Sequence, residues 1–264
     1  MTLSDTGAPR APFLTDDGAP RGFVIVSSAR SGSNLLVAYL RQVRRAACFG
    51  EVFRGEFPAK PGWDKLVQRL DLPADARELH RSDLSGFWEL VLSGALRRRT
   101  WAGAKAFYYH READPIWERF GASDHRVLHL WRDATFDQYV SRLLAVQSGE
   151  WKGGGGAAEP RVDFDADDYR RYRDGLRVGF ERTRERYGGS ERYVELEYRQ
   201  LTDHAFVQGL LQQLFGERIP VEETLRRQRT KPKLHYLRNP ADAEPFVADS
   251  LSAGCSGEMP RWPQ

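Results

Sequence analysis

The feature that most constrains the fold is a short apolar run that breaks into a tight turn and then a helical pattern, FVIVSSARSGSNLL at residues 23–36. A strand that enters a helix through so short a turn leaves the first backbone N–H groups of the helix without intrahelical partners, facing one concave space. The positive end of the helix dipole lies behind them. The pattern therefore predicts a bound anion, most often a phosphate, although a helix capped by Ser31 or Ser33 explains the same letters.

Apolar runs that are typical of strands recur along the chain, and helical patterns fill the gaps between them. The predicted strands are 22–28, 100–107, 125–131 and 191–198, and the predicted helices are 33–45, 83–98, 133–148, 165–187 and 202–215. Strands that alternate with helices predict an α/β fold of the P-loop type, with a mainly parallel central sheet flanked by helices. Ligands of such sheets bind beyond the carboxyl ends of the strands, where the opening turn lies.

The predicted organisation is a single domain over residues 21–240, between a flexible N-terminal tail at 1–20 and a loop-like C-terminal tail at 241–264. Both tails carry repeated Pro and Gly residues without a sustained period. The glycine run at 153–156 predicts a mobile loop.

Charge and cysteine content exclude several classes of protein. Lys and Arg number 40 against 37 Asp and Glu, and a net charge of +3 argues against a nucleic-acid partner. No run approaches the roughly 18 apolar residues of a membrane span, so we expect a soluble, cytoplasmic chain without an integral membrane segment. Cys48 and Cys255 are far apart and outside any metal-ligand spacing, which fits a reducing compartment and predicts no metal. The arginine runs at 41–45 and 97–99 are interpreted as solvated helix ends that could also approach an anionic acceptor or a lipid surface.

The opening turn is not a Walker A loop. That motif needs a lysine that reaches the β- and γ-phosphates and a following Ser or Thr that binds magnesium. Here Gly32 is the one glycine of the turn, Arg30 precedes it, and the lysine is missing. A turn this short is expected to hold one phosphate rather than a triphosphate.

The segment RSGSNLL resembles the 5′-phosphosulfate loop of sulfotransferases that use 3′-phosphoadenylyl sulfate (PAPS). It is most similar to that of the bacterial carbohydrate sulfotransferases of the trehalose and nodulation-factor type. The likeness continues in the same order over most of the chain, at residues 49–53, 103–110, 129–151, 194–201 and 225–232.

The resemblance implies that the turn holds the 5′-phosphate and sulfate of the donor, with contributions from Arg30, Ser31, Gly32, Ser33 and Asn34. Other branches of the family have a lysine at the position of Arg30, which can protonate the departing oxygen. A guanidinium with a pKa above about 12 cannot do so, and Arg30 is expected only to donate hydrogen bonds to that oxygen.

A second phosphate contact is implied for Arg132 and Ser141, which would bind the 3′-phosphate that distinguishes PAPS from ATP. Ser141 lies about two and a half helical turns along the predicted helix. The alternative is a strand-end arginine paired with Asp133 or Asp137. The block at 225–232 resembles the family's cover over the nucleotide and nominates Gln228, Arg229 and Lys231, with an ordinary basic helix end as the alternative.

The general base is expected to be Glu51, in a GE pattern that the family shares. Shelter by Phe49 and Phe53 predicts a raised pKa for this carboxyl. The trehalose-type pattern has a second Glu three positions later, where this chain has Arg54, and Glu56 is therefore a second candidate.

His110 is the third candidate base, because other branches of the family use a histidine; a packed or surface histidine is its alternative. Lys105 stands at a predicted strand end and is expected to hold sulfate or acceptor, or else to be a solvated lysine. Trp151 borders the glycine run and could stack on a sugar ring or an aromatic acceptor.

The sequence therefore predicts a sulfotransferase that moves a sulfuryl group from PAPS to a hydroxyl of a carbohydrate or related small metabolite, by in-line transfer without a metal, with PAP as product. A P-loop phosphotransferase that uses ATP and a non-catalytic nucleotide or nucleic-acid binding module are the competing hypotheses. The trehalose-type relatives suggest a homodimer.

Overall fold

A computed structural model describes residues 21–60, 62–110, 115–122, 125–149, 160–216, 218–222 and 231–252. The chain divides into two compact units, which we call the sheet unit (Met1–Trp131 with Phe180–Leu225) and the helical unit (Arg132–Gly179 with Arg226–Gln264). Each is described by itself. A single domain over residues 21–240 stays a prediction.

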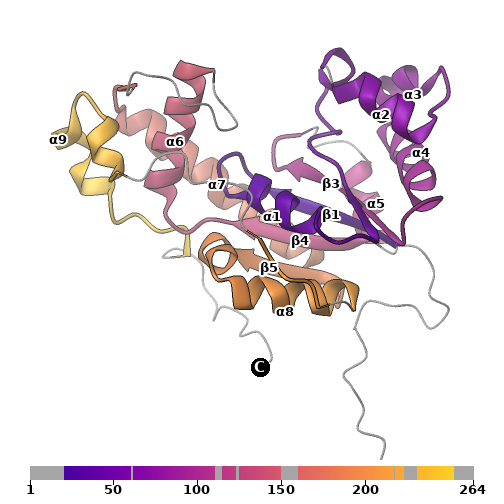
Figure 1. Cartoon of the computed structure of the whole chain (residues 1–264). Helices are drawn as coiled ribbons and strands as arrows, with labels where there is room; N and C mark the ends of the chain where they lie inside the picture. Colours follow the sequence, from indigo (N-terminus) through magenta and orange to yellow (C-terminus); the bar gives the residue numbers. More distant parts are fainter. Residues whose placement is uncertain are drawn as a thin grey trace, which may run out of the picture. The chain divides into compact units, whose positions relative to one another are not determined.

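The sheet unit is built on five parallel strands in the order β2-β3-β1-β4-β5. Figure 1 labels β3, β1, β4 and β5. Their bounds are β1 Arg21–Ser27, β2 Ala46–Cys48, β3 Trp101–Phe107, β4 Arg126–Trp131 and β5 Tyr193–Glu197. β1 lies in the middle and pairs along its whole length with β3, from Arg21 opposite Trp101 to Ser27 opposite Phe107. The strands therefore end at one edge of the sheet, and the turn after β1 lies at the centre of that edge.

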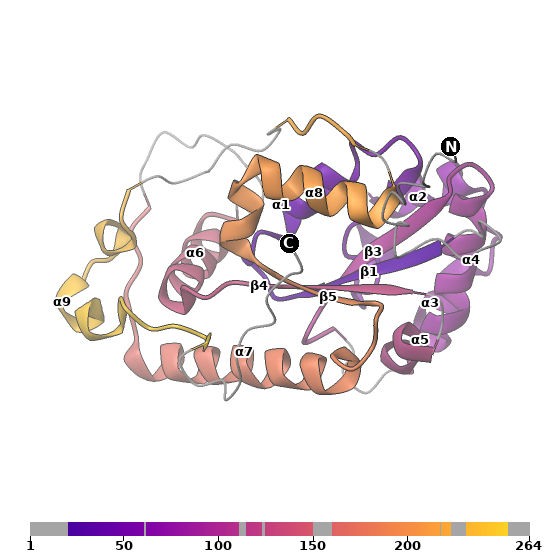
Figure 2. The ribbon, with the colours of Figure 1, turned by 90° about the horizontal axis from the view of Figure 1, so that it is seen from below.

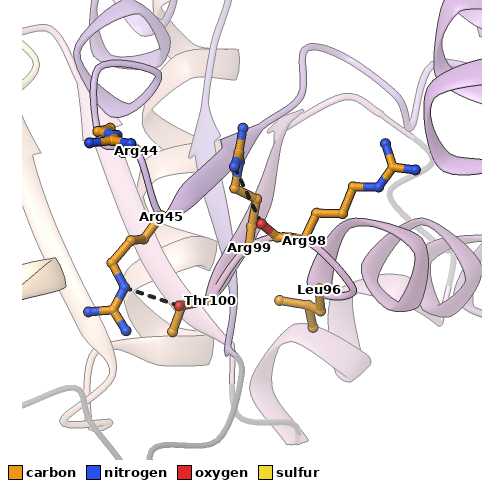
Figure 3. Close-up of a pocket in the computed structure, with 6 residues that line it drawn as sticks. All are labelled: Arg44, Arg45, Leu96, Arg98, Arg99 and Thr100. Carbon is orange, nitrogen blue, oxygen red and sulfur yellow. Dashed lines mark hydrogen bonds between the residues drawn. The ribbon is translucent and has the colours of Figure 1, made fainter.

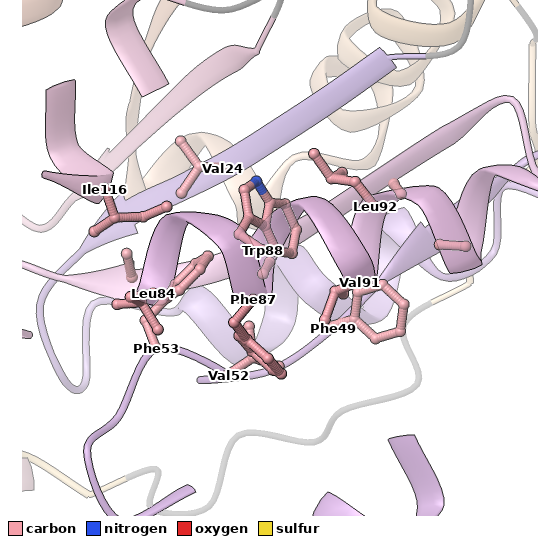
Figure 4. Packing of buried hydrophobic residues seen from close by; sticks show 14 of the residues in the cluster. Val24, Phe49, Val52, Phe53, Leu84, Phe87, Trp88, Val91, Leu92 and Ile116 are labelled. Carbon is pink, nitrogen blue, oxygen red and sulfur yellow. The ribbon is translucent and has the colours of Figure 1, made fainter. Parts of the chain in front are cut away.

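Helices cover both faces of this sheet. α1 (Ser33–Leu40) and α8 (His204–Phe215) pack on one face, as Figure 2 shows, around Ile25 and Leu196. The other face is covered by α2 (Gly62–Leu70), α3 (Ala76–Ser82), α4 (Leu84–Leu96) and α5 (Ile116–Ala122). Trp88 of α4 is fully buried there and lies near Val24 and Leu92 between helix and strand (Figure 4).

The α/β class, the parallel sheet and the four predicted strands are confirmed, with bounds that differ by one or two residues. The predicted helix at 33–45 is wrong at its end: it stops at Leu40, and residues 46–48 form β2. Three residues are too few for a periodic signal, and β2 is recognised only by its pairing with β3. The sequence reading also missed α2, α3 and α5, and the 3-10 turns η1 (Phe57–Ala59) and η2 (Tyr198–Thr202).

The helical unit contains α6 (Thr135–Ser148), the first part of α7 (Ala166–Tyr187), α9 (Pro240–Ala243) and the 3-10 turns η3 (Lys233–Tyr236) and η4 (Glu244–Phe246). Its core is aromatic: Tyr139, Phe164 and Tyr169 pack with ring centroids 5.3 to 5.9 Å apart. The predicted loop-like character from residue 241 is wrong as far as Phe246, because Ala243 is buried in this core. The glycine run at 153–156 and Trp151 lie outside the described residues.

A series of hydrogen-bonded polar side chains runs along one face of the sheet unit. Glu195 pairs with Arg184 at 3.0 Å and accepts a hydrogen bond from the Tyr193 hydroxyl at 2.9 Å. Burial lowers the pKa of His129 to about 3, so its ring is neutral, with one nitrogen 2.6 Å from the Tyr193 hydroxyl and the other 2.7 Å from that of Tyr108. Because Tyr193 donates to Glu195, it accepts from His129 Nδ1, and Nε2 then accepts from Tyr108. These hydrogen bonds hold the side chain of Tyr108, which directly follows β3, in place.

Gly103 tests the close packing at the centre of the sheet. A Cβ at this position of β3 would overlap the ring of Phe23 on the neighbouring strand. We expect Gly103→Ala to lower the free energy of unfolding by about 2 kcal/mol, because a fully buried ring has to move. Urea denaturation followed by circular dichroism measures the change.

The matched control is Gly209→Ala in α8, where a Cβ would meet nothing within 4 Å. This exposed helical position should gain roughly 0.5 to 1 kcal/mol, because alanine favours the helix. Equal effects of the two substitutions would contradict the packing described for Gly103.

Candidate active site

The candidate site lies where three adjacent strands of the sheet unit end. β2 leads into the segment that carries Glu51, β3 contains Lys105 near its end, and β1 leads into the turn before α1. Because these strands are parallel neighbours, their carboxyl ends meet at one edge. Backbone bonds hold the segment after β2 to β3: Phe49 N donates to Gly103 O at 2.8 Å, and Lys105 N donates to Gly50 O at 3.1 Å.

The turn after β1 holds two residues in left-handed backbone conformations, Arg30 with φ 64° and Gly32 with φ 91°. Gly32 is the N-cap of α1, and no side chain caps the helix. The alternative in which Ser31 or Ser33 caps the helix is therefore wrong, and the hydroxyl of Ser31 instead donates to Ser28 O at 2.8 Å. The first N–H groups of α1 are left without intrahelical acceptors and without an acidic residue in the first turn, as an anion site requires.

Glycine is required at position 32 for a second reason. A Cβ there would overlap the ring of Tyr198, the first residue after β5. At the end of β1, the hydroxyl of Ser27 is fully buried and has no hydrogen-bond partner among the residues described. Tyr198 was not singled out from the sequence, because only the order of strands in the sheet brings the residue after β5 to the turn after β1. Ser27 was not singled out either, because only the structure shows that its hydroxyl is buried without a partner in the described part of the chain.

Lys105 is the central charged group of the site. Its side chain is 2% exposed, and its ammonium donates to Asn34 Oδ1 at 2.8 Å and pairs with Glu51 Oε1 at 3.0 Å. The ammonium also lies 4.8 Å from the centre of the Phe107 ring. The alternative of a solvated strand-end lysine is wrong. A buried lysine between the turn and a carboxylate supplies, from the neighbouring strand, the ammonium group that the turn itself lacks.

The pKa of Glu51 is lowered, not raised as predicted from its aromatic neighbours. Burial does raise it, but the charge and hydrogen bond of Lys105, with smaller effects of His110 and Arg54, outweigh the burial. The sequence reading considered the shelter of Phe49 and Phe53 and missed the lysine on the next strand. Glu51 is therefore a carboxylate at neutral pH, in place and ionised.

Arg54 joins the two candidate glutamates. One guanidinium nitrogen lies 3.3 Å from Glu51 Oε2, and another forms a short ion pair with Glu56. The side chain of Glu56 is 50% exposed, against 24% for Glu51. Of the two carboxylates, Glu51 is the one that contacts Lys105 and is linked through it to the turn.

His110 has a structural role at the end of β3. Its Nδ1 accepts a hydrogen bond from Phe107 N at 3.1 Å, and its backbone carbonyl accepts from Trp117 Nε1 at 3.1 Å. Burial lowers the pKa of His110 to about 4, so the ring is neutral and carries its proton on Nε2. With Nδ1 occupied and Nε2 protonated, the ring is poorly placed to accept another proton.

The predicted 3′-phosphate contacts belong to the helical unit. Arg132 pairs with Asp137 at 2.8 Å, the pairing expected of an ordinary strand-end arginine, while Asp133 accepts from Ser250 at 2.6 Å. Ser141 is buried in α6. That these groups share a ligand with the turn stays a prediction.

Of the three residues predicted to cover the nucleotide, the structure describes one, Lys231. Lys231 lies 3.2 Å from Nε2 of His235, and Gln228 and Arg229 lie outside the described residues. Among the described residues, no group of three or more His, Cys, Asp or Glu side chains is arranged to hold a metal ion. None of the described helices is long and apolar enough to cross a lipid bilayer.

Comparison with known proteins identifies the fold. No protein-family model and no curated protein matches the chain. A crystal structure of a sulfotransferase from Alicyclobacillus acidocaldarius superposes with a TM-score of 0.53 and 17% identity, over 91% of this chain and 98% of that chain. The sulfotransferase domain of the olefin synthase of Synechococcus PCC 7002 gives a TM-score of 0.48 and 15% identity, over 95% of this chain and 93% of that domain. The first of these likenesses shows that the chain has the α/β fold of a sulfotransferase structure.

The pair formed by Lys105 and Glu51 can be tested by a double-mutant cycle. Glu51→Gln should cost about 3 kcal/mol of unfolding free energy at pH 7, because it leaves a buried ammonium without its carboxylate. Lys105→Met should cost less, because water still reaches the carboxylate, and the double variant should cost less than the sum. Additive losses in urea denaturation would show that the two groups do not interact.

The same pair predicts how stability depends on pH. The pKa of Glu51 in the folded chain lies below the ordinary 4.5, so its stabilising contribution is present above that value and is lost as pH falls through the lower, folded pKa. Glu51→Gln should abolish this part of the acid-induced loss of stability. Urea titrations between pH 3 and pH 7 measure this as a shallower dependence of the unfolding free energy on pH, by at most one proton.

Proposed function

We propose that this protein transfers a sulfuryl group from PAPS to an acceptor hydroxyl, with a carbohydrate or related small metabolite as the acceptor class. The observation that carries the proposal is the position of Lys105, whose ammonium bridges Asn34 of the turn and the carboxylate of Glu51. It joins an anion-binding turn to a base, which are the two parts that such a transfer needs. The fold shared with a sulfotransferase structure and the sequence resemblance support the same chemistry.

The residues of the turn fit a phosphosulfate. The uncapped N–H groups at the start of α1 and the small hydroxyl of Ser33 provide donors for oxyanions, and the positive φ of Gly32 shapes the turn around them. The hydroxyl of Ser31 donates to Ser28 O and holds the turn in this shape. The ammonium of Lys105 adds a positive charge beside Asn34. The donor, when bound there, would supply an activated sulfuryl group; the residues of this chain would orient it and stabilise charge on its oxygens.

In the proposed mechanism, the acceptor oxygen forms a bond to sulfur while the bond between sulfur and the bridging phosphate oxygen breaks. Glu51 takes the proton of the acceptor hydroxyl, and the negative charge goes to the phosphate oxygen of the leaving PAP. Protonation of Glu51 weakens its attraction for Lys105, so the ammonium becomes more available to the oxygen on which charge develops. Proton uptake and charge stabilisation are thus coupled through one buried lysine.

The arginine of the turn has a supporting role. Arg30 stays charged at every relevant pH and can donate hydrogen bonds to the leaving oxygen, but it cannot transfer a proton. Lys105 therefore takes the position of the cation next to the reacting group. Arg132 and Ser141 are proposed to bind the 3′-phosphate, which requires Arg132 to exchange its pairing with Asp137 for the ligand.

Ligand-induced stabilisation tests the donor assignment. At a hundred times its dissociation constant, PAP should stabilise the fold by about 2.7 kcal/mol, and ADP at the same concentration clearly less, because ADP lacks the 3′-phosphate. Thermal melts of the wild type and of Arg132→Ala and Ser141→Ala measure this, with the PAP-specific part lost in both variants. Equal shifts by PAP and ADP would remove the 3′-phosphate assignment, and a shift that requires ADP with Mg²⁺ would favour the phosphotransferase.

Measurements of kcat test the proposal that Glu51 is the general base. With PAPS, EDTA and a panel of sugars that includes trehalose, Glu51→Gln should lower kcat by about a hundredfold or more, because the acceptor proton then has no base. Glu56→Gln is the matched control: it removes the other carboxylate of Arg54 and should leave kcat within about twofold.

The activity should depend on pH through the same group. Since the pKa of Glu51 is lowered, the wild type should keep its activity down to pH values below the ordinary 4.5 of a glutamate. In Lys105→Gln the pKa of Glu51 rises, and the fall of kcat in acid should move to higher pH. If the pH at which kcat falls in acid is the same in Lys105→Gln and in the wild type, the proton is taken by a group other than Glu51.

A further inference from the structure

A second cationic surface lies in the sheet unit, away from the turn. It is a groove of about 570 Å³, lined by two pairs of arginines with a threonine and a leucine between them: Arg44, Arg45, Leu96, Arg98, Arg99 and Thr100. We call it the arginine groove. From the sequence alone, the two arginine runs of this groove are interpreted as two separate solvated helix ends. In the structure, the pairing of β2 with β3 brings the two runs together to line one groove.

Strand pairing brings the two runs together. Ala46 of β2 lies opposite Trp101 of β3, so the residues before each strand are neighbours although they are more than fifty positions apart. Thr100 N and Trp101 N both donate to Arg45 O, at 2.9 and 3.0 Å, and Arg45 Nε donates to the Thr100 hydroxyl at 3.3 Å. The groove is therefore held by backbone bonds and does not depend on flexible side chains to bring its walls together.

Three of the four arginines of this groove have no acidic partner among the described residues. Arg44, Arg98 and Arg99 are exposed, and none of them forms an ion pair with a described residue. The arginines of α7 differ: Arg170, Arg171 and Arg177 each pair with an aspartate three positions earlier. Like charges gathered at one place repel one another and cost stability, unless an anionic partner is bound. The contrast points to an external anion.

The arrangement of the side chains favours an extended acidic partner. In Figure 3 the guanidinium groups of Arg44, Arg45, Arg98 and Arg99 point in different directions and do not converge on one point. They therefore suit several carboxylates spread along a chain better than one small phosphate. None of the described residues that line the groove has an aromatic side chain on which a nucleic-acid base would stack. A concave surface whose one apolar residue among those described, Leu96, is half-buried also suits a protein segment better than a bilayer.

We propose that the arginine groove is a docking surface for an acidic segment of a partner protein, rich in Asp and Glu. It lies where β2 and β3 begin, whereas the candidate active site lies where the same strands end. A strand of seven residues separates the two edges by roughly 20 Å. A partner held in the groove leaves the turn accessible, so this surface serves recruitment and is independent of the reaction proposed above.

The test uses a fluorescein-labelled octaglutamate peptide and the full chain, with binding followed by fluorescence anisotropy. Arg44→Gln, Arg98→Gln and Arg99→Gln combined should weaken binding at least tenfold, and wild-type binding should weaken as salt is raised. The matched control combines Arg170→Gln, Arg171→Gln and Arg177→Gln, which removes the same net charge from α7 and should change binding less than twofold. Both triple variants replace exposed side chains, and thermal melts check that they fold.

Two further probes identify the class of partner. Vesicles that contain phosphatidylserine and a labelled octathymidylate are both negatively charged, and the proposal expects the binding of neither to depend on the three groove arginines as strongly as binding of the peptide does. If the two triple substitutions weaken binding of the peptide equally, the proposal is overturned, because binding would then depend on the net charge of the protein alone. Tighter, groove-dependent binding of vesicles or of octathymidylate would overturn it in favour of a membrane or a nucleic acid.

Discussion

The buried ammonium of Lys105 is the interaction on which the candidate site depends. A lysine that is 2% exposed is tolerated only if its charge is matched, and here Glu51 matches it while Asn34 accepts a further hydrogen bond. These contacts hold together the segment after β2, the end of β3 and the start of α1. The same contacts explain why the pKa of Glu51 is lowered despite burial, and so decide the charge state of the candidate base.

The parallel sheet explains why groups from distant parts of the sequence meet. Every strand of the sheet unit ends at the same edge, so a turn after β1, a lysine on β3 and a glutamate after β2 become neighbours without any special signal in their own segments. The strands also begin at one edge, and this is why residues 44–45 and 98–100 line one groove. One topology thus produces two cationic sites of different character: a buried ammonium with a specific carboxylate, and a set of exposed guanidinium groups.

The charges of the chain are therefore unevenly distributed. The net charge of +3 hides a helix, α7, in which Arg170, Arg171 and Arg177 pair with nearby aspartates, and a groove in which Arg44, Arg98 and Arg99 form no ion pair with a described residue. Composition averages over both. The chemistry of a surface is set by the local arrangement of charges, because in physiological salt the interaction between exposed charges fades over about 8 Å.

The sequence by itself determined the elements with a strong period: the four longer strands, the helices at 83–98, 133–148, 165–187 and 202–215, and the α/β class. It also indicated the turn at Gly32, because a left-handed glycine between a strand and a helix has few other uses. These are local properties, written in neighbouring residues.

Only the tertiary structure decided what crosses between segments. β2 is too short to be recognised without β3, and the pKa of Glu51 follows from a lysine 54 positions later in the chain. The neutral His110 with an occupied Nδ1, the contact of Gly32 with Tyr198 and the arginine groove are of the same kind. Electrostatic and packing energies depend on distances of a few ångströms between atoms, and those distances are fixed by strand order and register, which no single segment of the sequence contains.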